Sequence, residues 1–236
     1  MNPNLQLHPK VKWNSMFLQQ FSANTKGCDY VIGDLHGMYD LLFEALEKNH
    51  FNPKHDRCFS VGDLIDRGPD SEKCLLLIDE DWFFPVRGNH EDTLRQVTRT
   101  PCYTVMADWI VNGGNWHLNV AARTMHDYAD RVDQLPYIIE VERPDNTRVA
   151  ICHAEYPLAN WNPGKIEADP GLTKALQWSR QKVYEKDTSS VNGIDHIVCG
   201  HTIVDTPLTL GNSHFIDTGA YKSKVLTMLP LQDIGK

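Results

Sequence analysis

The sequence of 236 residues has no apolar run near the roughly 18 residues that a membrane-spanning helix needs, so we expect no membrane association. Its six cysteines are scattered without close pairs, and several lie inside apolar patterns where a reduced thiol packs as a small hydrophobic group. This distribution excludes a small fold held together by disulfides. We therefore expect a protein of the reducing cytoplasm.

Positive charge is not in excess either. The chain has 23 Lys and Arg residues against 31 Asp and Glu residues, which gives a formal net charge of -8. A broad surface for the phosphate backbone of DNA or RNA is therefore not expected, and we predict no nucleic-acid partner. The glycine-rich loop of nucleotide-driven enzymes, Gly-x-x-x-x-Gly-Lys-Ser/Thr, is absent as well.

Two covalent phosphatase chemistries lack their motifs. No cysteine is followed six positions later by arginine, which excludes the thiolate cradle of a cysteine phosphatase. An aspartyl-phosphate enzyme could begin at residues 76–81 (LLIDED), but Phe83 stands where such motifs usually carry Thr or Val. We interpret that segment as the end of a helix.

Polar residues follow short apolar runs at successive places in the chain. The runs at residues 30–32 and 58–61 predict strands that end at residues 33–37 (GDLHG) and 62–68 (GDLIDRG). Between them, residues 40–48 have the apolar spacing of an amphipathic helix. A strand, a helix and a second strand within about 30 residues form a βαβ unit, which brings both polar segments to one sheet edge.

The unit then repeats. Asp70 is a plausible helix start, and residues 82–86 predict the next strand, which ends at residues 87–91 (RGNHE). Because ligands bind at the carboxyl ends of parallel strands, the three polar segments are candidates for one site. The sequence therefore predicts an α/β protein built on βαβαβ units.

The second half of the chain is rich in predicted strands. Residues 136–141 and 147–151 flank one turn, and residues 208–210 and 214–216 flank another, so we expect two hairpins and more than one sheet. Residues 172–184 predict a single helix that would carry Arg180.

Carboxylate, amide and imidazole side chains at these strand ends could hold a pair of metal ions. Donors of this kind without cysteine favour Mn²⁺, Fe or Zn²⁺. The two later histidines follow strand-like runs at residues 148–152 and 197–200. The first ion would be held by Asp34, His36 and Asp63, and the second by Asp63 as a bridge with Asn89, His153 and His201.

The ordered set of motifs resembles the phosphoprotein phosphatase family of metallophosphoesterases, and in particular its short bacterial and bacteriophage branch of the lambda-phosphatase type. The similarity extends over about residues 27–230. After GDLHG, GDLIDRG and RGNHE it includes residues 112–116 (NGGNW), 152–157 (CHAEYP), 178–180 (WSR), 200–202 (GHT) and 216–220 (IDTGA). The resemblance implies the calcineurin-like fold, a central β-sandwich of mixed sheets flanked by helices.

The resemblance also implies the roles of individual residues. Two divalent ions, Mn²⁺ before Fe or Zn²⁺, would hold a bridging hydroxide that attacks a phosphate monoester directly. His90 would protonate the leaving alcohol, and Asp66 would pair with His90. The residues implied to bind the substrate phosphate are Arg67, Arg87, Asn89 and Arg180.

These roles predict a metal-dependent serine/threonine protein phosphatase, with dual specificity left open. Its substrates would be phosphorylated proteins or peptides, and we expect a monomer. The spread of candidate site residues from 34 to 201 predicts a single catalytic domain over residues 27–236. Residues 1–26 lack a signal-peptide pattern, and we expect them to be an N-terminal extension packed loosely on the domain.

Three alternatives remain. Diadenosine polyphosphate hydrolases resemble this family, although their second signature usually lacks the Asp-Arg-Gly of residues 66–68. Nucleases of the superfamily often end in Gly-His-x-His, where Ile203 stands here. An inactive relative that only binds phosphorylated partners would usually have lost a ligand or the acid. Within residues 98–133, where substrate choice is expected to reside, Trp116 is either a core residue or a substrate contact.

Overall fold

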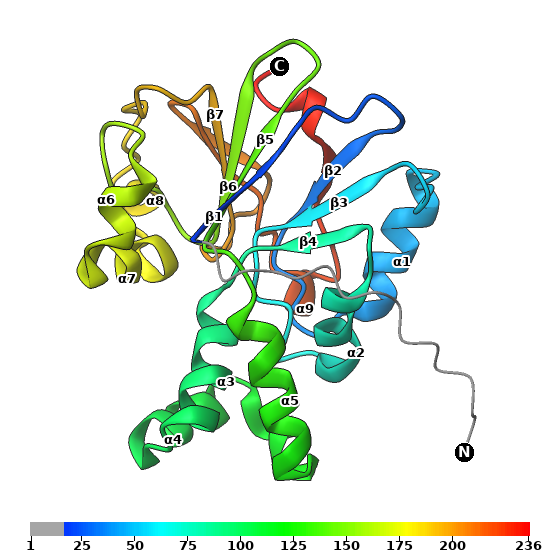
Figure 1. Cartoon of the computed structure of the whole chain (residues 1–236), viewed down its shortest axis with the longest axis vertical. Coiled ribbons are helices and arrows are strands. Elements are labelled where there is room, and N and C mark those ends of the chain that lie inside the picture. The colour runs from blue at the N-terminus through cyan, green and yellow to red at the C-terminus, as the bar shows by residue number, and fades with distance from the viewer. Residues whose placement is uncertain (1–16) are drawn as a thin grey trace.

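The structure, a computed structural model, describes residues 17–236 and consists of two β-sheets with helices outside them (Figure 1). The strand order is β10-β2-β3-β4 in the four-stranded sheet and β1-β5-β6-β7-β9-β8 in the six-stranded sheet. Both sheets contain parallel and antiparallel pairs. The predicted sandwich of mixed sheets is therefore confirmed.

The four-stranded sheet contains the predicted βαβαβ units. Strands β2, β3 and β4 are parallel, and β10 pairs with β2 in the antiparallel direction. Helix α1 joins β2 to β3, and α2 lies between β3 and β4 with Asp70 at its N-terminus, as expected. The bounds are β2 (Asp29–Ile32), α1 (Tyr39–Lys48), β3 (Arg57–Ser60), α2 (Ser71–Leu76), the 3₁₀ turn η1 (Leu77–Asp79), β4 (Phe83–Pro85) and β10 (Met228–Pro230).

The six-stranded sheet contains both predicted hairpins. Strand β5 pairs antiparallel with β6, and β8 pairs antiparallel with β9. The bounds are β1 (Leu18–Phe21), β5 (Ile138–Glu142), β6 (Arg148–Cys152), β7 (His196–Cys199), β8 (Leu208–Leu210) and β9 (Ser213–Phe215).

Strand β1 corrects one expectation. Loose packing was predicted for residues 1–26, of which residues 1–16 lie outside the described part of the chain. Residues 18–21, however, form an edge strand parallel to β5, with Leu18 opposite Ile138. Phe21 contacts the rings of Phe59 and Phe84 edge-on, with centroids 5.2 and 4.8 Å apart. This aromatic contact and the strand pairing hold the segment on the sandwich.

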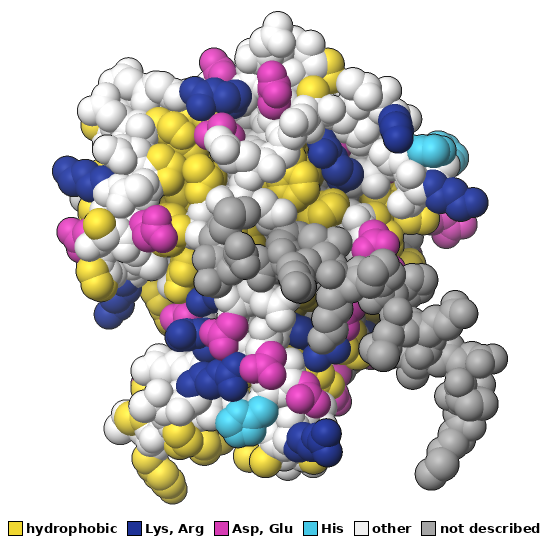
Figure 2. Space-filling view, in the orientation of Figure 1, with side chains coloured by type: hydrophobic (Ala, Val, Ile, Leu, Met, Phe, Trp, Pro, Cys, Tyr) yellow, Lys and Arg dark blue, Asp and Glu magenta, His cyan; other side chains and the backbone are white. Residues whose placement is uncertain are grey.

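Three helices and a 3₁₀ segment form a lobe that projects beyond the four-stranded sheet, at the bottom of Figure 1. Apolar side chains are exposed at the tip of this lobe where α4 lies (Figure 2), and Tyr103 and Val111 of α4 are 90% and 85% exposed. The bounds are α3 (Asn89–Arg99), α4 (Tyr103–Val111), the 3₁₀ segment η2 (Gly114–Asn119) and α5 (Ala122–Asp133).

Three further helices lie beside the six-stranded sheet, and they correct the prediction of one helix over residues 172–184. The backbone leaves the helical conformation at Ser179, whose ψ is 144°, and the next helix begins after Arg180. The Ser179 hydroxyl donates to Glu155, which fixes the break. The bounds are α6 (Pro163–Glu167), α7 (Pro170–Trp178) and α8 (Gln181–Tyr184), with α9 (Ala220–Ser223) and the 3₁₀ turn η3 (Leu231–Asp233) near the C-terminus.

The facing sides of the two sheets bury one apolar cluster. Val31 and Phe59 from one sheet pack in the same cluster as Ile139 and Val198 from the other, and all four are fully buried. This contact holds the sheets together and fixes the relative positions of the loops that follow their strands. None of the helices in residues 17–236 has the length and apolar character to cross a bilayer.

Candidate active site

The loops that follow β2, β3, β4, β6 and β7 meet at one edge of the sandwich, and several of their residues have an unusual backbone. Nine non-glycine residues between 17 and 236 have positive φ, and five of them are candidate site residues. Such a conformation costs of the order of 1–3 kcal/mol per residue and typically marks functional sites. The five are His36, Asp63, Asp66, Arg67 and His201, with φ of 43°, 50°, 73°, 69° and 63°.

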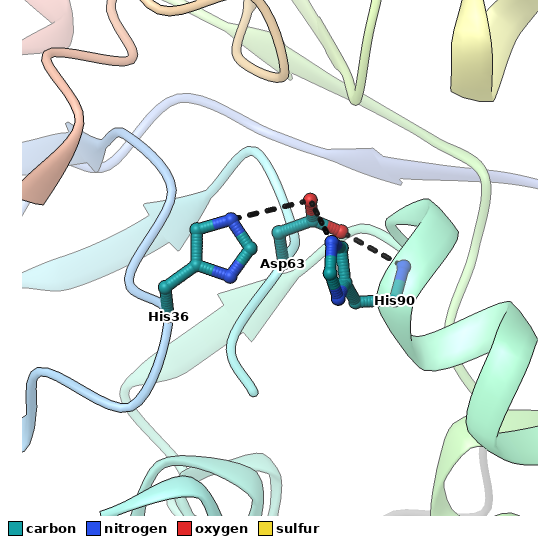
Figure 3. Close-up of side chains that lie close together, drawn as sticks. All are labelled: His36, Asp63 and His90. Atoms are coloured by element: carbon teal, nitrogen blue, oxygen red, sulfur yellow. Dashed lines mark hydrogen bonds and ion pairs between the residues drawn. The ribbon is translucent and has the colours of Figure 1, made fainter. Parts of the chain in front are cut away.

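Asp63 lies at the centre of this edge (Figure 3). Its Oδ2 is 3.6 Å from His36 Nε2, 3.8 Å from His90 Nε2 and 3.3 Å from His153 Nε2. Its Oδ1 accepts a hydrogen bond from the backbone N–H of His90 at 3.0 Å. One carboxylate therefore faces three imidazole rings, two from loops and one from the first turn of α3, an arrangement that suits a residue shared between two metal sites.

The four donors predicted for the second ion converge. His153 Nε2 lies 2.8 Å from Asn89 Oδ1, 3.2 Å from His201 Nδ1 and 3.3 Å from Asp63 Oδ2. His153 Nδ1 donates to the carbonyl of Val61 at 2.7 Å, which leaves Nε2 directed at the other donors.

His201 gives a second sign that a cation fits here. Burial, followed by the neighbouring His153, lowers the pKa of His201 to about 3. The imidazole ring is therefore neutral and can offer a lone pair to a metal ion. Its Nε2 is buried and has no hydrogen-bond partner among residues 17–236. The nitrogen that lies beside the other donors is Nδ1, 3.2 Å from His153 Nε2, so a neutral His201 can offer its Nδ1 lone pair to an ion there.

Of the three donors predicted for the first ion, His36 and Asp63 fall in one group of close ligand atoms, in which His90 and not Asp34 is the third member. His36 Nε2 lies 3.9 Å from Asp34 Oδ2 and 3.6 Å from Asp63 Oδ2, and His36 Nδ1 donates to the carbonyl of Ile65 at 2.8 Å. Burial, followed by the charges of Asp217 and Asp63, raises the pKa of Asp34 well above its usual value. A cation between these carboxylates would remove that repulsion. Ligand atoms of His36, Asp63 and His90, and those of Asp63, His153 and His201, form two groups in which all atoms lie within 4.8 Å.

His90 and Asp66 form a hydrogen-bonded pair, as the resemblance implied. His90 Nδ1 is 2.5 Å from Asp66 Oδ2, and the Asp66 side chain is fully buried. Burial of His90 disfavours its charged form, but the carboxylates of Asp63 and Asp66 outweigh this effect and raise the pKa of His90. The ring is therefore held in position and favoured in the protonated form, as a proton donor requires.

The three candidate arginines are placed differently. Arg67 donates to His36 Nε2 and lies over the ring of Tyr221, and Arg180 donates to the backbone carbonyl of His201 at 2.7 Å. Both line the cavity described below. Arg87 does not line it.

The guanidinium of Arg87 instead binds two backbone carbonyls. It donates to Asp133 O at 3.0 Å and Leu135 O at 3.2 Å, and to the hydroxyl of Tyr137 at 3.1 Å. The structure therefore brings Arg67 and Arg180 to the cluster and directs Arg87 toward the end of α5.

A cavity of about 820 Å³ opens above the cluster. Its floor is formed by Asn89, His90, Arg67, Arg180 and His201, and its walls come from α3, α4, α6 and α7. The volume far exceeds that of a phosphate group and lies in the range of sites for larger ligands. The wall residues include Thr93, Gln96, Val105, Asp108, Glu167, Thr173, Lys174 and Trp178.

Glu91 is a site residue to which the sequence assigned no role, although it is the last residue of RGNHE. It is fully buried and accepts the backbone N–H groups of Asp63, Leu64 and Gly88 at 2.9, 2.8 and 3.0 Å. Burial, followed by the charge of Asp63, raises the pKa of Glu91 to about 7. Its position three residues into α3, where acidic side chains bind free N–H groups, was the available signal.

This fold and site define a phosphoesterase built to hold metal ions. The sequence profile of the calcineurin-like phosphoesterase family matches residues 30–205, and the chain belongs to that family. Members of this family are hydrolytic enzymes, so the protein is an enzyme of the phosphoesterase class.

Among the proteins similar to this chain are two bacterial serine/threonine-protein phosphatases. Serine/threonine-protein phosphatase 1 of Salmonella typhimurium is 36% identical over 210 residues, which is 86% of this chain and 91% of that protein. Serine/threonine-protein phosphatase 2 of Escherichia coli is 34% identical over 217 residues, or 91% and 97% of the two chains. The predicted resemblance to bacterial phosphoprotein phosphatases is thereby confirmed.

Proteins named for the alternative activity are similar as well, either over about a third of the chain or, at 23% identity, over 86% of it. Symmetrical bis(5'-nucleosyl)-tetraphosphatase of Pseudomonas entomophila is 36% identical over 99 residues, which is 34% of this chain and 35% of that protein. The crystal structure of a putative diadenosine tetraphosphatase superposes with a TM-score of 0.62 and 17% identity, covering 91% of this chain and 98% of the other. At that identity the superposition shows the shared fold alone.

Proposed function

We propose that this protein is a metal-dependent phosphoprotein phosphatase that hydrolyses phosphate monoesters of serine and threonine. The observation that carries the proposal is the His90–Asp66 pair beside the shared carboxylate of Asp63, at the floor of an open cavity. The similarity to two serine/threonine phosphatases over more than nine-tenths of their length supports the protein substrate.

The donor set fits two divalent ions, and we assign Mn²⁺ first because carboxylate, amide and imidazole ligands suit it. Asp34, His36 and Asp63 would hold one ion, and Asp63, Asn89, His153 and His201 the other. Bound ions would supply Lewis acidity toward the phosphate and activate water as the nucleophile.

The protein's own residues account for the remaining needs of the reaction. Arg67 and Arg180 present permanently charged donors at the cavity floor, which suits a phosphate dianion. Asn89 adds a polar side chain at the same place. His90 lines the cavity, and because its Nδ1 is bound to Asp66, Nε2 is the ring nitrogen left to transfer a proton to the leaving alkoxide.

Hydrolysis of diadenosine polyphosphates is the second candidate function. It is favoured by the partial similarity to symmetrical bis(5'-nucleosyl)-tetraphosphatases and by a cavity with room for more than a phosphate group. On the cavity wall, Asp108 and Glu167 would repel a polyanionic dinucleotide and Lys174 would attract it, so the charge of the wall does not favour this substrate over a phosphopeptide.

The test is phosphate release from a phosphoserine peptide by metal-stripped enzyme, before and after addition of Mn²⁺, with diadenosine tetraphosphate in parallel. Mn²⁺-dependent turnover of the peptide and not of the dinucleotide is expected. Preference for the dinucleotide would replace the proposal by the second candidate. Absence of turnover on both substrates, with Mn²⁺ bound, would point to a binding role.

A further inference from the structure

Two tryptophan side chains from the lobe meet on the carboxylate of Asp66. Trp109 Nε1, from α4, donates to Asp66 Oδ2 at 2.7 Å, and Trp116 Nε1, from η2, donates to Asp66 Oδ1 at 2.6 Å. Because His90 Nδ1 also contacts Oδ2, the carboxylate is held from three directions. An indole N–H can only donate, so each of these bonds has one fixed sense.

The glycine pair between the two tryptophans makes this arrangement possible. Gly113 has φ of 102°, and a Cβ at this position would lie 2.5 Å from the backbone nitrogen of Arg67. A Cβ on Gly114 would lie 2.4 Å from Trp109 Nε1. The carbonyl of Gly113 also accepts the N–H of Arg67 at 3.3 Å. The segment can therefore lie directly against the Asp66–Arg67 backbone only without side chains at these positions.

We infer that Trp109 and Trp116 are positioning residues, which fix the Asp66 carboxylate and, through its bond to Nδ1, the His90 ring that lines the cavity. The inference rests on the proposed function in one respect, since it assumes that His90 donates the proton. Trp116 does not line the cavity, and the N–H of Trp109 is directed at Asp66, so neither indole nitrogen is available to a substrate.

The test is a comparison of leaving groups in the full-length, metal-loaded chain. Trp109→Phe and Trp116→Phe keep an aromatic ring and remove the donor. A proton donor contributes about 10²–10⁴-fold to the rate of such a reaction. We therefore expect kcat for a phosphoserine peptide to fall roughly tenfold when the His90 ring is held less firmly. We expect less than about a twofold change in kcat for p-nitrophenyl phosphate, whose leaving group needs no proton, and in KM for both substrates.

Trp161→Phe is the matched control. Trp161 Nε1 donates to Glu140 at 3.0 Å, so this variant also loses a bond between an indole and a carboxylate, but not a bond to Asp66. We expect it to leave both turnover numbers unchanged. Metal content and Tm, measured for every variant, separate loss of the proton donor from loss of folded enzyme.

A second experiment introduces Trp116→Phe into the His90→Asn variant. If the tryptophans act through His90, adding Trp116→Phe to His90→Asn will not lower kcat further. Equal losses on both substrates, a rise in KM without a fall in kcat, or additive losses in the double variant would each overturn the inference.

Failure of the proposed function gives a different result. If the wild-type chain releases no phosphate from the peptide, the protein-phosphatase proposal fails. The inference is then tested with aryl phosphates of graded leaving-group pKa. A steeper dependence of kcat on leaving-group pKa in Trp109→Phe and Trp116→Phe than in wild type would support it, and an unchanged dependence would overturn it.

Discussion

The floor and the walls of the cavity differ in how their side chains are held. On the floor, Asn89, His90 and His201 are 6% exposed or less, and they bond to His153, Asp66 and Asp34, which come from three different loops. On the walls, Asp108 and Lys174 are exposed at the surface of helices. A floor fixed by the fold is arranged before any substrate arrives, whereas the walls are free to contact it. If the proposed function holds, we expect substitutions on the floor to change kcat and substitutions on the walls to change the choice of substrate.

The largest loss of turnover is expected from Asp63→Asn. The amide cannot replace a carboxylate shared by both sites, and bound metals contribute several kcal/mol of charge stabilisation, so turnover should fall by roughly three orders of magnitude. Metal content after gel filtration and phosphate release measure the effect. Asp145→Asn, the same change on an exposed side chain, is the control. A variant that keeps its metal and its rate would contradict the role of Asp63 as the shared ligand.

His90→Asn should have the next largest effect, and it should depend on the substrate. Loss of the proton donor should lower kcat for a phosphoserine peptide about 10²–10³-fold and change that for p-nitrophenyl phosphate much less. Metal content should stay as in wild type. His126→Asn, at an exposed position of α5, serves as control. Equal losses for the two leaving groups would refute the assignment of His90 as the acid.

Arg180 lies at the cavity floor and Arg87 lies outside the cavity, so substitutions of these two arginines should have different effects. Arg87 binds the carbonyls of Asp133 and Leu135, so Arg87→Met should lower the free energy of unfolding by about 1–3 kcal/mol. Arg180→Met should instead raise KM about tenfold with little loss of stability, since loss of one charge-assisted hydrogen bond costs of the order of 1.5–3 kcal/mol. Urea unfolding and steady-state kinetics measure both. A stable Arg87→Met with a raised KM would place Arg87 at the substrate phosphate.

The smallest effect is expected at the tip of the lobe. Tyr103 and Val111 are 90% and 85% exposed on the face of α4 away from the cavity. Tyr103→Ser and Val111→Ser should therefore change the free energy of unfolding by less than about 0.5 kcal/mol. Turnover of p-nitrophenyl phosphate should be unchanged. A loss of turnover would show that this face of α4 supports the site.

Much of this arrangement was predictable because its parts are continuous in the chain. The runs before GDLHG and GDLIDRG are short and apolar, and a helical pattern separates them, so parallel strands with adjacent ends followed directly. The two hairpins had turn residues between alternating runs and were also predicted correctly. The position of Asp34 and Asp63 at one sheet edge needs nothing beyond these local patterns.

The errors come from contacts between distant segments. The helix predicted over residues 172–184 is broken at Ser179, whose hydroxyl is bound by Glu155 from another loop. Residues 18–21 show little pattern of their own, yet they pair with β5, about 120 residues along the chain. Local propensity carries no information about such partners.

The sequence by itself determined which carboxylates, imidazoles and arginines follow the strands, and in what order. Only the tertiary structure decided how each is used. Asp63 and Asp66 lie three residues apart in one loop, yet one faces the rings of His36 and His153 and the other is bound by Trp109 and Trp116. The tryptophans are 43 and 50 residues away from Asp66 in the chain, and packing of the lobe against this loop brings them there. A side chain's chemistry is local, but its surroundings depend on which distant segments the folded core places beside it.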